Sequence, residues 1–281
     1  MSNHPEALVQ KLSKLAYDLR LDVIRMVYTA GSGHIGGSMS AAEIVTALMF
    51  HHLRIDPKQP NWPDRDRFLL SKGHAAPVLY AALAHLGFFS IEELETLRRL
   101  DSRLQGHPDR LRTPGVEMTS GFLGHGIAIG VGLALAARLD GARWKVCVLV
   151  GDGEIQAGVI WEGAMAAAKF KLGNLTTIVD YNHMQLDGPV DEIMPVEPLG
   201  DKWRSFGWRV REINGHNMRQ ILEALDEADQ VQDRPSVILA HTTKGKGVSF
   251  MEGEHRWHSR APTKDEYSRA VSELEWKRDN A

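Results

Sequence analysis

Two oxygen-bearing side chains, Asp152 and Asn182, each follow a short apolar run in the middle of the chain. Asp152 stands between Gly151 and Gly153, and Asn182 comes thirty positions later, followed by a Leu-Asp-Gly turn. A carboxylate and an amide oxygen are hard ligands that suit Mg2+ or Ca2+, above all an ion that also binds phosphate oxygens. An Asp-Gly turn alone is common in loops, but the asparagine at this spacing favours a site for a metal ion and a diphosphate.

A strand, a helix and a second strand are the elements that must position this pair. Val146–Val150 and Leu175–Val179 are short apolar runs typical of strands buried on both faces. Gly158–Lys171 has apolar or small residues at helical spacing. A right-handed crossover makes the two strands parallel. Asp152 and Asn182 are then predicted at the same carboxyl edge, where open α/β sheets bind ligands and where the glycine amides can approach a diphosphate at a helix N-terminus.

The rest of the chain also alternates between helical and strand-like patterns. Further helices are predicted over Glu6–Tyr28, Ala41–His52, Ala75–Leu86, Ile91–Leu100, Ile127–Leu139, Asp201–Phe206 and Asn217–Ala228, and further strands from Phe68, over Trp208–Ile213 and over Ser236–Ala240. This alternation predicts an α/β fold with a doubly wound, mostly parallel sheet and helices on both faces. We expect one domain over residues 1–281, in which 263–281 form a charged, partly helical surface tail.

Composition excludes several classes of protein. The chain has 281 residues, of which 43% are hydrophobic and 25% charged, as in ordinary globular proteins. A formal charge of -3 gives no reason to expect nucleic acid or an anionic membrane as a partner. The single cysteine, Cys147, lies inside an apolar run and is predicted to be a core residue in a reducing compartment. No apolar stretch has transmembrane length and the polar start Met1–Gln10 is not a signal peptide, so we expect a cytoplasmic protein.

The G-D-G motif followed by asparagine resembles the thiamine diphosphate motif, and K-L-G-N-L-T-T-I-V-D-Y-N-H-M-Q-L-D-G is similar to transketolases. The resemblance runs from about Leu12 to Pro262 through separate segments in matching order: Ser32–His34, Arg65–His74, Gly121–Gly126, Thr242–Gly247 and Trp257–Pro262. It implies thiamine diphosphate and Mg2+ as cofactors, with Ca2+ or Mn2+ as possible substitutes. The metal ligands implied are Asp152, Asn182 and the backbone carbonyl of Met184. The residues implied in binding the cofactor are His74, Gly121, Leu123, Gly151, Asp152, Gly153, Asn182, Leu186, Lys244 and His258.

Four histidines from distant loops are also in register with the family. A single loop histidine is usually a polar surface group, but four in matching order are predicted to converge, and imidazoles move protons near neutral pH. By resemblance, His34 and His258 handle protons on the donor's hydroxyls, His107 binds the donor's C1 hydroxyl, and His74 contacts the diphosphate. The resemblance also implies a catalytic role for Glu162, which belongs to a hydrogen-bonded cluster of acids at the dimer interface.

The resemblance covers only the first of the three domains of a full-length transketolase. It therefore implies the N-terminal subunit of a split enzyme, which transfers a two-carbon ketol unit from a ketose phosphate to an aldose phosphate. The glutamate that makes the cofactor's imino nitrogen basic is then expected on a C-terminal partner subunit, together with the pyrimidine-binding domain. We expect activity only in the complex, a heterotetramer with two chains of each kind. The sugars themselves stay open.

Two alternatives also explain part of the sequence. The alpha subunit of a 2-oxo acid dehydrogenase shares the G-D-G…N pattern, but it does not explain Ser71–His74 or Trp257-His258. A non-catalytic remnant that binds the cofactor agrees with Ala157, which stands where the family usually has a glutamate. Ile35, Phe122 and Ser259 are further departures from the family pattern.

Overall fold

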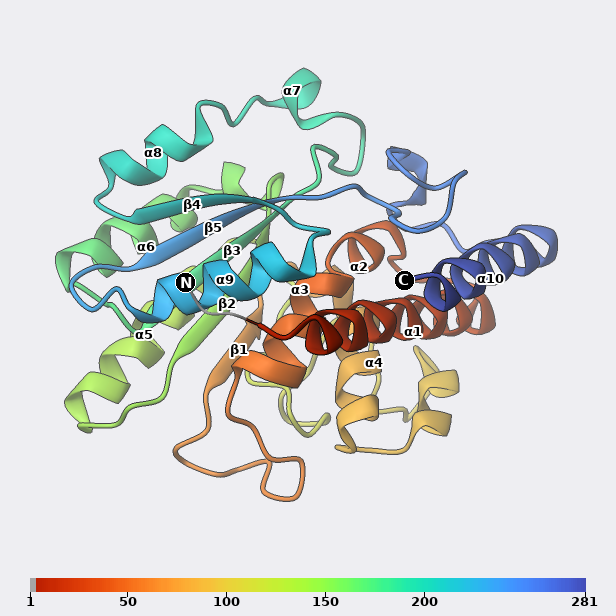
Figure 1. Ribbon diagram of the computed structural model, residues 1–281, viewed down its shortest axis with the longest axis horizontal. Coiled ribbons are helices and arrows are strands. Elements are labelled where there is room, and N and C mark those ends of the chain that lie inside the picture. Colours follow the sequence, from red (N-terminus) through yellow and green to blue (C-terminus); the bar gives the residue numbers. More distant parts are fainter. Residues whose placement is uncertain (1–3) are drawn as a thin grey trace.

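Five parallel strands form a single sheet in the computed structural model, which describes residues 4–281 (Figure 1). The first three residues of the polar start Met1–Gln10 lie outside the described part. The strands are β1 (Arg67–Leu70), β2 (Val146–Gly151), β3 (Leu175–Tyr181), β4 (Arg209–Asn214) and β5 (Ser236–His241), in the spatial order β1-β2-β3-β5-β4. Every neighbouring pair is parallel. The predicted α/β fold with a parallel sheet is therefore confirmed.

Helices connect the strands. They are α1 (Glu6–Ala30), α2 (Gly36–Ser40), α3 (Ala42–Ala47), α4 (Ala76–Leu86), α5 (His125–Leu139), α6 (Gly158–Lys169), α7 (Val190–Ile193), α8 (Leu199–Ser205), α9 (Met218–Asp229) and α10 (Lys264–Asp279). Short 3-10 turns add Gly73–Ala75, Ile91–Thr96, Glu154–Gln156 and His255–Trp257. Within residues 4–281 none of these helices combines the length and the apolar character needed to cross a bilayer.

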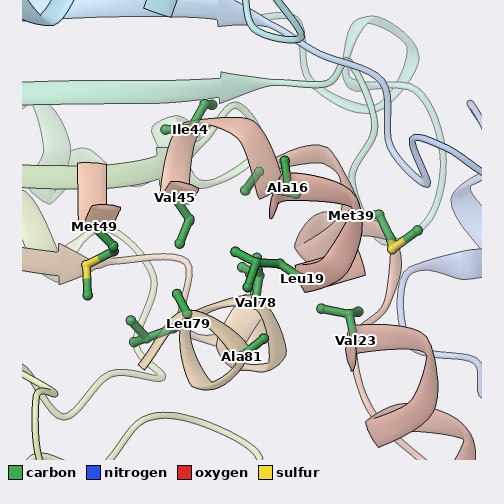
Figure 2. Close-up of a cluster of buried hydrophobic side chains, with 14 of the residues drawn as sticks. Ala16, Leu19, Val23, Met39, Ile44, Val45, Met49, Val78, Leu79 and Ala81 are labelled. Atoms are coloured by element: carbon green, nitrogen blue, oxygen red, sulfur yellow. The ribbon is translucent and has the colours of Figure 1, made fainter. Parts of the chain in front are cut away.

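The helices cover both faces of the sheet because successive strand residues point to opposite sides. In β2, Cys147 and Leu149 face a core shared with α1, α3, α4 and α9, whereas Val146, Val148 and Val150 face a second core shared with α5, α6 and α8. Figure 2 shows part of the first core, where α1, α3 and α4 bring apolar side chains together. Cys147 is 1% exposed, as expected of a core residue.

Two predicted helices take a different form. The predicted helix Ala41–His52 divides into α3 and a π-helical turn over Leu48–His52. The predicted helix Ile91–Leu100 is a 3-10 turn that ends at Thr96, because the backbone leaves the helical region at Leu97, with ψ 127°; Arg98 after it is left-handed, with φ 60°. The spacing of apolar residues does not reveal a change from an α-helix to a π-helical or 3-10 turn, because these helices place apolar residues at nearly the same spacing.

The segment 263–281 is a helix over most of its length and contributes to the core. Thr263 and Glu266 form a capping box at the start of α10. Ala270 and Leu274 are buried, and α10 lies along α1, where the rings of Tyr28 and Tyr267 stack with centroids 4.2 Å apart (Figure 1). The Thr-x-x-Glu pattern that begins at Thr263 is a sequence signal for the start of a helix.

The register of β2 and β3 positions the predicted metal ligands Asp152 and Asn182. Gly151 at the end of β2 lies opposite Asp180 in β3, so both chains leave the sheet at the same level. Asp152 and Asn182 therefore emerge side by side at the carboxyl edge, as the strand–helix–strand pattern predicts.

Candidate active site

A cavity of about 300 Å3 opens at the carboxyl edge of the sheet. Its lining includes ten of the predicted site residues: His74, Leu123, Gly151, Asp152, Gly153, Asn182, Met184, Leu186, Lys244 and His258. These residues come from the ends of β2, β3 and β5 and from the loops before α4, α5 and α10. The fold thus brings together side chains that are distant in sequence.

Asp152 and Asn182 are held by the backbone of the same two turns. One carboxylate oxygen of Asp152 accepts a hydrogen bond from the Gly153 amide at 2.8 Å, and the other accepts one from the His183 amide at 2.5 Å. The amide oxygen of Asn182 accepts a hydrogen bond from the Met184 amide at 3.1 Å. His183 has a left-handed backbone, with φ 61°, that turns the chain at this point.

The donor set fits a hard divalent cation. It offers one carboxylate, one amide oxygen and the Met184 carbonyl, and oxygen ligands of this kind suit Mg2+, which also uses substrate phosphates and water. The Nζ atom of Lys244 lies 3.3 Å from the Met184 carbonyl oxygen and 3.1 Å from that of Gln185, so these carbonyls face a place that a cation can reach. In residues 4–281, no three acidic, histidine or cysteine side chains gather as a metal site.

The electrostatics of Asp152 also favour a bound cation. Its side chain is 2% exposed, and burial, with the charge of Asp180, raises the pKa of Asp152 to about 7. Hydrogen bonds from two backbone amides and the charge of Lys244 only partly oppose this rise. A divalent ion next to the carboxylate would stabilise its charged form.

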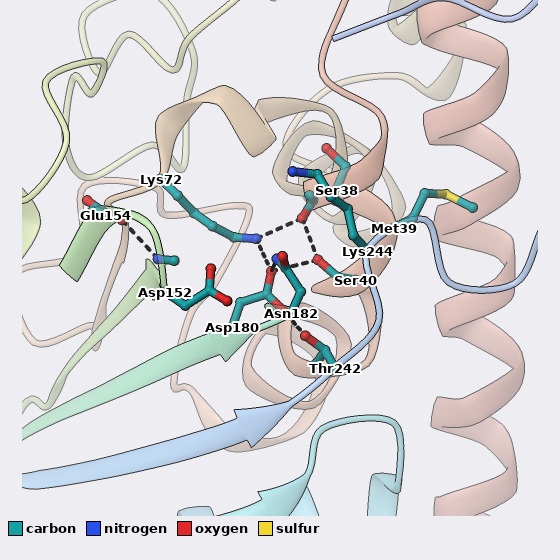
Figure 3. Close-up of polar contacts among 12 residues, drawn as sticks. Ser38, Met39, Ser40, Lys72, Asp152, Glu154, Asp180, Asn182, Thr242 and Lys244 are labelled. Carbon is teal, nitrogen blue, oxygen red and sulfur yellow. Dashed lines mark hydrogen bonds and ion pairs between the residues drawn. The ribbon is translucent and has the colours of Figure 1, made fainter. Parts of the chain in front are cut away.

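A buried ion pair that sequence analysis missed supports Asn182. Asp180, fully buried near the end of β3, accepts hydrogen bonds from Lys72, Thr242 and Ser40, the last at 2.6 Å (Figure 3). It also accepts one from the side-chain nitrogen of Asn182 at 3.1 Å. Burial opposes the charge of Asp180, but Lys72 and the hydroxyl donors hold its pKa below the usual value. With its nitrogen engaged, Asn182 keeps its oxygen on the side of Met184.

Glu154 is a second group that sequence analysis missed. Its buried carboxylate accepts hydrogen bonds from the Ser71 hydroxyl, the Gly124 amide at 2.7 Å and the Gly151 amide at 3.0 Å. The first two donors lie in loops that come from different parts of the chain. Glu154 therefore ties three cavity loops to one another, and its place directly after the G-D-G motif was the available signal.

The four predicted histidines lie together at the cavity. The ring centroid of His34 is 5.3 Å from that of His74, 5.9 Å from that of His107 and 5.3 Å from that of His258. The rings of His74 and His258 are 4.9 Å apart. The fold thus brings these side chains together as the resemblance implies, while their individual roles stay predictions.

Two of these imidazoles are neutral at physiological pH. Burial, reinforced by the charges of Lys244 and His34, lowers the pKa of His258 to about 3. Burial and the charge of Arg98 lower the pKa of His34 to about 4. The Nζ atom of Lys244 lies 2.9 Å from Nδ1 of His258. Since an ammonium can only donate, Nδ1 accepts and the proton of neutral His258 is on Nε2.

We expect His258 to make the folded protein less stable in mild acid. Its folded pKa lies below that of the unfolded chain, so as the pH falls below about 6.5 the unfolded chain takes up the proton first and stability is lost. The midpoint of thermal unfolding, measured in EDTA at pH 7.5 and 5.0, should therefore fall less in His258→Gln than in the wild type. The exposed His255 provides the control variant His255→Gln. Equal falls in all three proteins would contradict the prediction.

Four predicted residues lie outside the cavity lining: His34, His107, Gly121 and Glu162. His107 is exposed and joins the site through its neighbour His34. Gly121 lies beside His107, since a Cβ on this glycine would be 3.9 Å from the His107 ring. Glu162 is exposed on α6, away from the cavity lining, and its place in an acid cluster at a dimer interface stays a prediction.

Comparison with known proteins identifies the family. Residues 12–281 match the model of the transketolase thiamine diphosphate binding domain. The chain is 49% identical to a 6-deoxy-6-sulfo-D-fructose transketolase subunit from Clostridium sp. (strain MSTE9), over 87% of this chain and 89% of that subunit. It is 44% identical to an apulose-4-phosphate transketolase subunit from Phocaeicola vulgatus, over 91% of this chain and 90% of that subunit.

Solved structures agree with this match. Transketolase from Campylobacter jejuni superposes with a TM-score of 0.88 at 33% identity, over 94% of this chain. A transketolase mutant from Pichia stipitis superposes with a TM-score of 0.89 at 32% identity, also over 94% of this chain. The matched region spans only 43% and 40% of those two longer chains. This chain therefore belongs to the transketolase family, as a subunit that carries its thiamine diphosphate-binding domain.

Proposed function

We propose that this chain is the N-terminal subunit of a two-chain transketolase, which moves a two-carbon ketol unit from a ketose phosphate to an aldose phosphate. The observation that supports this most directly is the convergence of four loop histidines over a cavity that contains Asp152, Asn182 and the Met184 carbonyl. The two relatives described above are named for a sulfonated ketose and for a sugar phosphate. We therefore include sugars with a terminal sulfonate among the proposed substrates.

The same cavity would hold the cofactors. Asp152, Asn182 and the Met184 carbonyl would hold Mg2+, and the amides around Gly151 and Gly153, with His74 and Lys244, would hold the diphosphate. When bound, thiamine diphosphate supplies a carbon nucleophile that can take up a ketol unit and release it to an aldose. Gly153 suits this role because a Cβ there would come within 3.0 Å of the Gln185 side chain and narrow the cavity.

Neutral imidazoles suit the proton transfers of this reaction. With Lys244 donating to its Nδ1, His258 presents Nε2–H to a substrate oxygen. His34 lies beside it and can accept a hydroxyl proton as the donor's carbon–carbon bond breaks. His107 would bind the C1 hydroxyl at the outer side of the cluster.

A partner subunit would complete the site. The cavity-lining leucines are open to solvent here, with Leu123 45% and Leu186 55% exposed, and Phe122, the neighbour of Leu123 in the chain, is 82% exposed. Apolar side chains around a binding site favour a surface that another protein covers. The proposed partner is a C-terminal transketolase subunit with the pyrimidine-binding domain, in a cytoplasmic heterotetramer with two chains of each kind.

Reconstitution tests the proposal. We expect no ketol transfer from this chain alone, and transfer after it is mixed with a C-terminal transketolase subunit from the same genome, thiamine diphosphate and Mg2+. The partner alone serves as the control. Activity from this chain by itself would contradict a shared site. Tight cofactor binding without activity in the mixture would favour the non-catalytic interpretation.

A further inference from the structure

Arg98 lies at the histidine cluster although none of the recognised motifs contains it. Its Nη2 atom is 3.5 Å from Nδ1 of His34. The guanidinium also lies against the backbone of Gly106, where a Cβ would come within 3.0 Å of Nε and Nη2. Its positive charge lowers the pKa of His34 and of His107, after the larger effect of burial. Arg98 therefore contacts His34, one of the three histidines proposed to bind the sugar.

The backbone around Arg98 is constrained. Its φ of 60° lies in the left-handed region, which is uncommon for residues other than glycine. The Arg98 amide donates to the Leu104 carbonyl at 2.8 Å, and Leu97 and Leu104 are buried with 1% and 0% exposure. Residues kept in such conformations are concentrated at binding and active sites, where the surrounding structure holds them in place. The fold thus presents this side chain from an anchored loop.

The charge of Arg98 is not neutralised by an acid. Two nearby arginines have carboxylate partners, since Arg103 pairs with Glu93 at 3.0 Å and Arg112 with Asp109 at 3.7 Å. Within residues 4–281 Arg98 forms no such pair, and its side-chain hydrogen bond is with the imidazole of His34. Its side chain is exposed. A planar guanidinium with free donors suits the tetrahedral oxygens of a phosphate or a sulfonate.

We propose that Arg98 binds the anionic terminal group of the sugar substrate and so helps to determine substrate specificity. The inference rests on the proposed function and adds a residue of this chain to an anion site that was expected mostly on the partner. A sugar that contacts His34 also lies near the guanidinium, because the two side chains are in contact. The recognised group is a terminal oxyanion, carried as phosphate or as sulfonate.

The test is Arg98→Gln in the reconstituted complex, assayed with xylulose 5-phosphate, 6-deoxy-6-sulfofructose and uncharged xylulose as donors. Hydrogen bonds to charged groups contribute about 1.5–3 kcal/mol, so kcat/KM for an anionic donor should fall about 10- to 100-fold, mainly through KM. The value for xylulose should stay within about twofold. A fall with the phosphate donor only, or the sulfonate donor only, supports the proposal and names the group. Equal falls with all three donors would overturn it.

The matched control is Arg99→Gln, which removes the same charge from the next exposed position. It should leave all three donors unaffected, and a loss equal to that of Arg98→Gln would overturn the proposal. Arg98→Lys, which keeps the charge, should restore part of the affinity. If the wild-type complex uses no donor, the proposed function fails. Calorimetric titration of the wild-type and Arg98→Gln complexes with fructose 6-phosphate and with fructose then tests the role of Arg98 separately. Weaker phosphate binding in Arg98→Gln alone supports the proposal; equal binding overturns it.

Discussion

Replacing Asp152 with asparagine is expected to abolish Mg2+-dependent binding of thiamine diphosphate. The substitution keeps the size of the side chain but removes the one charged group from the proposed metal ligands. An asparagine must also present its NH2 group to one of the two backbone amides that now donate to the carboxylate, from Gly153 and His183. Substituting residues behind metal ligands commonly costs 10- to 100-fold in affinity, so loss of a charged ligand should exceed about 100-fold.

Calorimetric titration of thiamine diphosphate in the presence and absence of Mg2+ measures this effect without any partner subunit. The exposed carboxylate of Asp191, on the short helix α7, provides the control variant Asp191→Asn, which should bind as the wild type does. Circular dichroism should show that both variants are folded. If Asp152→Asn retained Mg2+-dependent binding within a few-fold of the wild type, Asp152 would not be a metal ligand.

The position of Asp152 and Asn182 at one edge of the sheet could be predicted from the sequence because it depends on local patterns. Two apolar runs, cut by glycine or ended by a polar residue and joined by a helical pattern, are enough to make the strands parallel and to align Asp152 with Asn182. The convergence of His34 and His258 has no such basis, because no spacing within the chain brings their two loops together. Family resemblance supplied that expectation, and the structure shows the rings 5.3 Å apart.

The missed groups are those whose partners are far away in the sequence. In the sequence Asp180 is a single polar residue near the end of a predicted strand. Its partner Lys72 is 108 positions away, so no local pattern indicates the pair. Arg98 lies in a pattern that predicts a helix, whereas its backbone is left-handed and its side chain contacts His34. Buried ion pairs and single turns depend on the assembled fold, so periodicity and propensity do not report them.

The Lys72–Asp180 pair is expected to have the largest effect on stability. Lys72→Met leaves the buried carboxylate of Asp180 without its cation, and breaking such a pair usually costs about 3–5 kcal/mol in the free energy of unfolding. Asp180→Asn should cost a similar amount, because the Lys72 ammonium then stays buried beside an amide. The double variant should lose clearly less than the sum of the two, since no charge is left unpaired. Urea unfolding of the wild type, the two single variants and the double variant measures these free energies.

A second lysine–aspartate pair shows whether burial is the cause. Lys145 and Asp229 are also in contact, at 2.5 Å, but their side chains are 29% and 27% exposed. Lys145→Met should therefore cost about 1 kcal/mol or less. If Lys72→Met were no more destabilising than Lys145→Met, the argument from burial would be wrong.

The position of the buried pair explains why an apolar core does not replace it. Asp180 accepts a hydrogen bond from the side-chain nitrogen of Asn182, and this hydrogen bond keeps the Asn182 oxygen available to a cation. The Lys72→Met, Asp180→Asn double variant should accordingly recover stability without recovering Mg2+ affinity, because a neutral amide at position 180 holds Asn182 less firmly than a carboxylate does. Recovery of both properties would show that the pair serves the fold alone. Recovery of stability without Mg2+ affinity would show that the charge of Asp180 serves to orient Asn182, the proposed metal ligand.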